Sequence, residues 1–137
     1  MQNKFHALTG RKILIVDHST LITSLLSDVF GACGAFVSKA NSGQEAMFLI
    51  RLENFELVLL DPVMPPPNGW DLLQFMRRIK PELPAKTILL TCDRYGKDAS
   101  RAIAQAKMPV VYKPFNIDKL RSLACDVLCS TDSKHVA

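Results

Sequence analysis

Polar side chains that could do chemistry follow the ends of four apolar runs in the chain. Asp17 and Asp61 each follow an unbroken aliphatic run, and Thr91 and Lys113 end two further runs. Two carboxylates in one crevice repel each other unless a lysine or a divalent ion lies between them. Carboxylates with open positions beside them suit Mg²⁺, whose coordination phosphate oxygens complete. Such a set is suited to a phosphoryl group, with Asp61 as its nucleophile and with Lys113, Thr91 and the metal stabilising its oxygens.

The run before Asp61 predicts a buried strand of a parallel sheet. Leu57–Leu60 has no alternating polar face, which is typical of a strand covered on both sides. The proline-rich segment Pro62–Gly69 cannot continue that strand, so the chain leaves the sheet at Asp61. Ligands of open α/β sheets bind outside the carboxyl ends of the strands. A lone aspartate there usually caps a turn, but four chemically matched groups at four strand ends favour a site.

Five strands are predicted to alternate with five helices. The helices are predicted from apolar residues at helical spacing and from candidate capping residues at their starts. These capping residues are Ser19 or Thr20, Ser42 with Glu45, and Asn116. The predicted strands are Lys12–Asp17, Phe36–Ala40, Leu57–Leu60, Thr87–Thr91 and Val110–Lys113. The predicted helices are Leu21–Phe30, Ala46–Ile50, Leu72–Ile79, Arg94–Lys107 and Ile117–Leu128.

This alternation predicts a three-layer α/β sandwich around a parallel sheet. A flavodoxin-like, doubly wound strand order, 2-1-3-4-5, would bring the ends of the first and third strands side by side. We expect one domain over residues 12–129, preceded by a polar lead at 1–11. The polar tail at 130–137 is expected to fray.

Composition narrows the class of protein. The 137 residues are 48% hydrophobic and 22% charged, as in an ordinary globular domain. The sequence shows neither an apolar run long enough for a bilayer nor a signal peptide, so a cytoplasmic location is expected. Lysine and arginine are scattered despite the net charge of +4, which argues against nucleic-acid binding. The four cysteines lack Cys-x-x-Cys spacing and are expected to be reduced.

From Lys12 to Leu128 the chain resembles the receiver domain of two-component response regulators. The matching pieces are ILIVD ending on Asp17, D-x-x-M-P-x-x-x-G beginning at Asp61, the pair Thr91-Cys92, and Lys113-Pro114-Phe115. The resemblance implies that Asp61 accepts a phosphoryl group from a sensor histidine kinase or a phosphotransfer protein. Such a domain catalyses only its own phosphorylation and dephosphorylation, so it is not a conventional enzyme.

The resemblance also assigns roles around Asp61. Asp17, Asp61 and the Val63 carbonyl would hold Mg²⁺, and the backbone amides of Val63 and Cys92 would contact the phosphoryl oxygens. The signal would leave through the face of the fourth helix, fifth strand and fifth helix, toward a separate output protein. The candidate switch residues are Thr91, Val110 and Tyr112, and a monomer or weak dimer is expected.

Three residues depart from the family pattern. His18 stands where a second acidic residue is usual, so we expect weakened Mg²⁺ binding, with Mn²⁺ as a possible substitute and His18 as a further candidate ligand. Pro62 lacks the N–H that could reach the phosphoryl group, and Val110 replaces an aromatic switch residue. These departures keep open an alternative, a pseudo-receiver that binds partners without phosphorylation. A phosphohydrolase is disfavoured because Val63 stands where its second aspartate would be.

Overall fold

The computed structural model describes residues 5–92 and 107–135, with side chains as far as residue 132. Five parallel strands form one sheet in the order β2-β1-β3-β4-β5, which confirms the predicted topology. The fourth predicted helix, Arg94–Lys107, lies almost wholly outside the described residues. The strands are β1 Lys12–Val16, β2 Phe36–Ala40, β3 Leu57–Leu60, β4 Thr87–Thr91 and β5 Val110–Tyr112. The helices are α1 Thr20–Ala32, α2 Gly43–Leu52, α3 Gly69–Ile79 and α5 Ile117–His135, with short 3-10 turns at His6–Leu8 and Pro84–Lys86.

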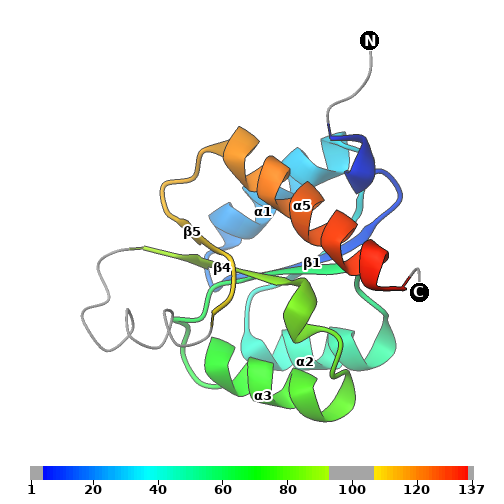
Figure 1. Ribbon diagram of the computed structural model, residues 1–137. Coiled ribbons are helices and arrows are strands. Elements are labelled where there is room, and N and C mark those ends of the chain that lie inside the picture. Colours follow the sequence, from blue (N-terminus) through cyan, green and yellow to red (C-terminus); the bar gives the residue numbers. More distant parts are fainter. Residues whose placement is uncertain (1–4, 93–106, 136–137) are drawn as a thin grey trace.

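Helices cover both faces of the sheet. α1 and α5 lie on one side, and α2 and α3 lie on the other (Figure 1). Alternate residues of β1 and β3 enter the two cores: Ile13 and Leu57 pack toward α1 and α5, and Leu14 and Val58 pack toward α2 and α3. All four residues of β3 are fully buried, which explains why this strand carries no polar face.

Helix starts are set by side-chain caps. Ser19 Oγ accepts a hydrogen bond from Ile22 N at the start of α1, and Ser42 Oγ accepts one from Glu45 N at the start of α2. α3 begins at Gly69, three residues before the predicted start. Asn68 and Asp71 form a reciprocal capping box there, with bonds of 3.0 and 2.9 Å.

The chain ends are more ordered than predicted. In the segment expected to be a polar lead, Phe5 and Leu8 enter the core beside α1 and α5, and the Arg121 guanidinium lies 4.5 Å from the centre of the Phe5 ring. The predicted frayed tail is wrong for residues 130–135, because α5 continues to His135. Thr131 extends the inward stripe of α5 and bonds back to Val127 O.

An ion pair connects the C-terminal part of α5 to the residue that precedes β1. Arg11, just before β1, contacts both carboxylate oxygens of Asp132 at 3.1 and 2.6 Å. Among the helices that the structure describes, none is both long and apolar enough to cross a membrane.

Candidate functional site

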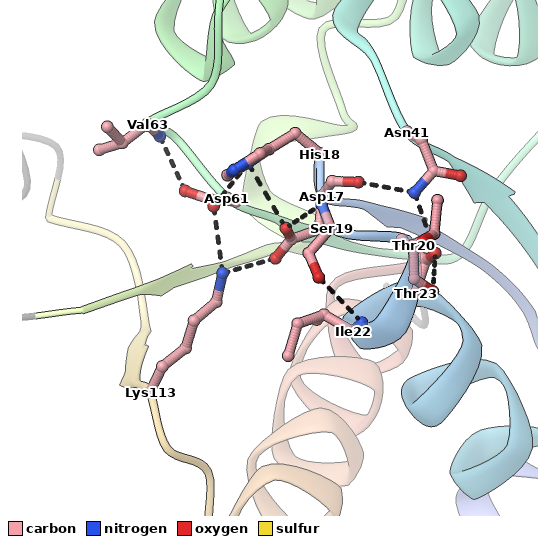
Figure 2. A network of polar contacts seen from close by, with 10 residues as sticks. All are labelled: Asp17, His18, Ser19, Thr20, Ile22, Thr23, Asn41, Asp61, Val63 and Lys113. Carbon is pink, nitrogen blue, oxygen red and sulfur yellow. Dashed lines mark hydrogen bonds and ion pairs between the residues drawn. The ribbon is translucent and has the colours of Figure 1, made fainter.

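Two buried carboxylates and one ammonium group form the centre of the site. Asp17 directly follows β1 and Asp61 directly follows β3, and these neighbouring strands are in register at Val16 and Leu60. Lys113 follows β5, and its Nζ lies 2.6 Å from Asp17 Oδ2 and 3.1 Å from Asp61 Oδ2 (Figure 2). Both aspartates are fully buried. The structure therefore brings together three of the groups that the strand-end rule placed at this edge.

The second oxygen of each carboxylate is held by a backbone amide. Ser19 N donates to Asp17 Oδ1 at 2.9 Å, and Val63 N donates to Asp61 Oδ1 at 2.8 Å. Because Pro62 has no N–H, Val63 carries the first amide after Asp61. All four carboxylate oxygens thus accept a hydrogen bond from the protein, which limits the cost of burying them.

Burial and charge act in opposite directions on the ionisable groups. Burial raises the pKa of Asp61, and the repulsion from Asp17 adds to that rise, while the Val63 amide and the Lys113 charge oppose it. Burial by itself would lower the pKa of Lys113, but the hydrogen bonds and charges of Asp17 and Asp61 outweigh it and raise that pKa. Lys113 therefore stays a cation at this site.

His18 extends the cluster toward solvent. Its Nδ1 lies 3.7 Å from Asp17 Oδ1 and 3.8 Å from Asp61 Oδ2, beyond ordinary hydrogen-bond distance. The side chain is 49% exposed, whereas the two aspartates are not exposed at all. One ligand atom from each of the three residues lies within 4.8 Å of the other two. The donor set can therefore converge on one divalent cation, with two carboxylates and an imidazole as its protein ligands.

The other predicted site residues lie along β4 and β5. Thr91 is fully buried at the end of β4, and its hydroxyl has no hydrogen-bond partner within the part of the chain that the structure describes. Its carbonyl accepts from Lys113 N at 2.6 Å, which ties the end of β4 to the lysine. Cys92 is the next residue in the chain after Thr91, and it is partly buried. Val110 packs against the core on the α2 and α3 side, and Tyr112 is 49% exposed.

Sequence reasoning missed two residues that shape the site. Asn41 Nδ2 donates to the backbone carbonyl of Asp17 at 2.9 Å and to Thr23 Oγ1 at 3.0 Å (Figure 2). Ser19 was predicted as a helix cap only, yet its amide also holds Asp17. Asn41 is the first residue after β2, so the strand-end rule that selected Asp17 and Asp61 would have found it as well.

The raised pKa of Asp61 leads to a prediction about stability. The folded protein binds this proton more tightly than the unfolded chain, so the free energy of unfolding falls as pH rises above the usual value of 3.8. Asp61→Asn removes that loss while an amide oxygen still faces Val63 N. In chelator-treated protein, urea unfolding should show a higher free energy of unfolding for the variant than for the native chain at neutral pH.

The pH profile is the informative part of that measurement. The advantage of Asp61→Asn should shrink as pH falls through the raised pKa of Asp61 and should vanish below 3.8, where the carboxyl group is neutral in both the folded and the unfolded protein. Asp28→Asn, a change at an exposed position of α1, serves as the control and should show little effect at any pH. An Asp61→Asn effect that is constant across the pH range would contradict the assigned cause.

A family model supports the class that the fold and site define. The model described as "Response regulator receiver domain" matches residues 13–124. The chain belongs to this family: it is a receiver domain of two-component response regulators, and receiver domains of this kind are signalling modules that interact with histidine kinases and output domains.

Curated relatives are similar over most of this chain. The response regulator protein PilR of Pseudomonas aeruginosa is 29% identical over 123 residues, which are 88% of this chain and 27% of PilR. The probable transcriptional regulator ycf27 of Guillardia theta is 30% identical over 90% of this chain and 48% of its own length. The chain thus spans about a quarter to a half of the length of these relatives.

Solved structures show the same fold. The receiver domain of the Francisella response regulator 1452 has a TM-score of 0.75 at 25% identity, covering 89% of this chain and 99% of that one. NtrX from Brucella abortus has a TM-score of 0.81 at 25% identity, covering 93% of this chain and 29% of NtrX.

Proposed function

We propose that this receiver domain accepts a phosphoryl group on the carboxylate of Asp61 and thereby switches a protein-interaction face. The observation that carries the proposal is the ammonium of Lys113 held between two buried carboxylates at the ends of β1 and β3. A preorganised cation beside a buried nucleophile stabilises the charge that develops on a transferring phosphoryl group. The hydroxyl of Thr91, which has no hydrogen-bond partner among the described residues, would donate to the same group.

The proposed step exchanges one phosphorus bond for another. A carboxylate oxygen of Asp61 attacks phosphorus, and the bond from phosphorus to the donor nitrogen of a phosphohistidine breaks. The electron pair of that bond returns to the donor imidazole, and Asp61 becomes a mixed anhydride of a carboxylic and a phosphoric acid. The donor is then a histidine kinase or a phosphotransfer protein, and we expect the exchange in the cytoplasm.

A divalent cation belongs to this proposal. Asp17 and Asp61 supply hard oxygen ligands, the Val63 carbonyl follows closely in the chain, and His18 lies at the open side. When bound, the ion neutralises charge on the phosphoryl oxygens. We expect Mg²⁺ to bind weakly, because an imidazole replaces an oxygen ligand there, and Mn²⁺ to substitute for it.

The proposed output face includes β5 and α5. A groove of about 410 Å³ lies there, with Val110, Tyr112 and Pro114 on its strand side and Asn116, Lys119 and Leu123 on its helix side. Lys113 lies between the groove residues Tyr112 and Pro114, so a shift of this lysine on phosphorylation would reach the groove through one peptide unit on either side. We propose that an output partner reads this surface.

The test is intact-mass analysis after incubation with acetyl phosphate and a divalent cation. Transfer to Asp61 releases acetate and adds one phosphoryl group to the protein, and a chelator should suppress it. Asp61→Asn should show no gain, while Asp28→Asn, at an exposed position of α1, should behave as the native chain does. A gain that persists in Asp61→Asn would place the acceptor elsewhere. No gain with any cation would favour the pseudo-receiver, a module that binds partners unmodified.

A further inference from the structure

The imidazole of His18 is the one nitrogen donor in the group of three candidate metal ligands among the described residues. Its Nδ1 faces the same two aspartates that Lys113 bridges, at 3.7 Å from Asp17 Oδ1 and 3.8 Å from Asp61 Oδ2 (Figure 2). These distances are too long for hydrogen bonds. Two ligand atoms that each lie about 2.1 Å from one ion are roughly 3 Å apart. A shift of less than an ångström would bring His18 Nδ1 to that separation from either carboxylate oxygen.

We propose that Asp17, His18 and Asp61 select a borderline transition-metal dication, of the class of Co²⁺, Ni²⁺ and Zn²⁺, over Mg²⁺. The inference rests on the proposed function in placing the cation beside the phosphoacceptor. Imidazole is a good ligand for these ions, whereas Mg²⁺ is bound through oxygen and keeps most of its water. One nitrogen and two carboxylate oxygens form a mixed donor set that favours the transition-metal ions over Mg²⁺.

The charge of the site points the same way. Two carboxylates and the Lys113 ammonium leave a single negative charge when the imidazole is neutral. Mg²⁺ binding depends largely on such charge, and Lys113 already contacts both Oδ2 atoms. A transition ion gains the nitrogen bond in addition, and each carboxylate oxygen keeps a second lone pair for it.

The position of His18 makes the ligand accessible and replaceable. The side chain is 49% exposed, so it can rotate onto an ion without disturbing the core, and its substitution should leave the fold intact. Its backbone follows Asp17 directly at the end of β1, and the Asp17 carbonyl is fixed by Asn41. The imidazole is therefore carried by a positioned segment of backbone.

Metal titration of the full chain, free of any affinity tag and stripped with a chelator, tests the inference without an activity assay. Co²⁺ is added and its visible absorption followed, and Mg²⁺ is then titrated as a competitor. We expect Co²⁺ to bind at least about tenfold more tightly than Mg²⁺. His18→Ala should lower Co²⁺ affinity about tenfold or more, and His18→Asp should shift the preference toward Mg²⁺. His6→Ala, which removes an exposed histidine of the 3-10 turn before the start of β1, at the opposite end of that strand from His18, should change neither.

Two results would overturn the inference: equal Co²⁺ affinity in the native chain and His18→Ala, or an unchanged Co²⁺-to-Mg²⁺ ratio in His18→Asp. Far-ultraviolet circular dichroism of each variant excludes a loss of folding.

The acetyl phosphate assay separates this inference from the proposed function. Phosphorylation of Asp61 with Mg²⁺ and no role for His18 in binding would retain the function and reject the metal preference. Tight Co²⁺ binding through His18 without phosphorylation would retain the metal preference and reject the proposed function.

Discussion

Replacing Lys113 with methionine should slow phosphoryl transfer to Asp61 by about 10²–10³-fold, the loss typical of removing one preorganised donor from a reacting charge. Methionine keeps much of the length of the side chain but removes the ammonium that contacts Asp17 and Asp61. Nothing else among the described side chains of the site supplies a permanent positive charge to both carboxylates. The rate is measured as the time course of mass gain with acetyl phosphate at a saturating cation concentration.

Two further variants make that result specific. Lys119→Met removes an exposed lysine of α5 and should leave the rate within about twofold, since an exposed charge is largely screened. Lys113→Arg restores a cation with a different shape and should recover part of the rate. A Lys113→Met protein that is folded by circular dichroism and phosphorylated at the native rate would show that the lysine is not part of the transfer site.

Gly69→Ala should destabilise the protein by about 3 kcal/mol and displace the segment that holds Asp61. A Cβ atom at Gly69 would lie 2.3 Å from Pro62 Cα and 3.1 Å from Asp61 O. Both neighbours are backbone atoms, so a side-chain rotation cannot relieve the contact. Gly69 N also donates to Pro62 O at 3.1 Å, and the turn closes on itself there. Urea unfolding measures the loss, and the acetyl phosphate assay should show weaker phosphorylation of the folded fraction.

Gly31→Ala is the matched control for Gly69→Ala. Gly31 lies in α1, and a Cβ atom there would meet no atom of the described residues within 4 Å, apart from its chain neighbours and the nearby backbone of its own helix. Alanine is the better helix former, so this substitution should raise the free energy of unfolding by about 0.5 kcal/mol. Opposite signs for the two substitutions would identify the contact with Pro62 as the cause. Similar small effects at both positions would show that the turn tolerates the added methyl group.

The close contact at Gly69 also explains part of the sequence pattern. In the segment that begins at Asp61, the final glycine is the residue at which α3 meets the turn just after the aspartate. A comparable contact joins this loop to α2, where a Cβ atom at Gly43 would lie 2.1 Å from Pro67 O. Both glycines are the first residues of their helices, and only the folded chain shows which backbone each one approaches.

Much of the fold follows from local pattern. Continuous aliphatic runs such as Leu57–Leu60 predict strands buried on both faces, because no polar side chain could face solvent there. The alternation of such runs with amphipathic segments predicts the parallel sheet and its two helical layers. The predictions failed at the chain ends, where Phe5 and Thr131 looked like parts of polar segments. Their burial depends on α5 and the first residues meeting across the domain, a contact between distant parts of the chain that no local pattern records.

By itself, the sequence determined that Asp17, Asp61, Thr91 and Lys113 end strands at one edge of a sheet, because the period of side chains and the breaks at proline and glycine are local properties. Only the tertiary structure decided how these groups pair. Lys113 lies nearer to Asp17 than to Asp61, and His18 approaches both carboxylates without bonding to either. Such distances depend on strand register and on backbone anchors such as Asn41, which are fixed when separate segments pack together.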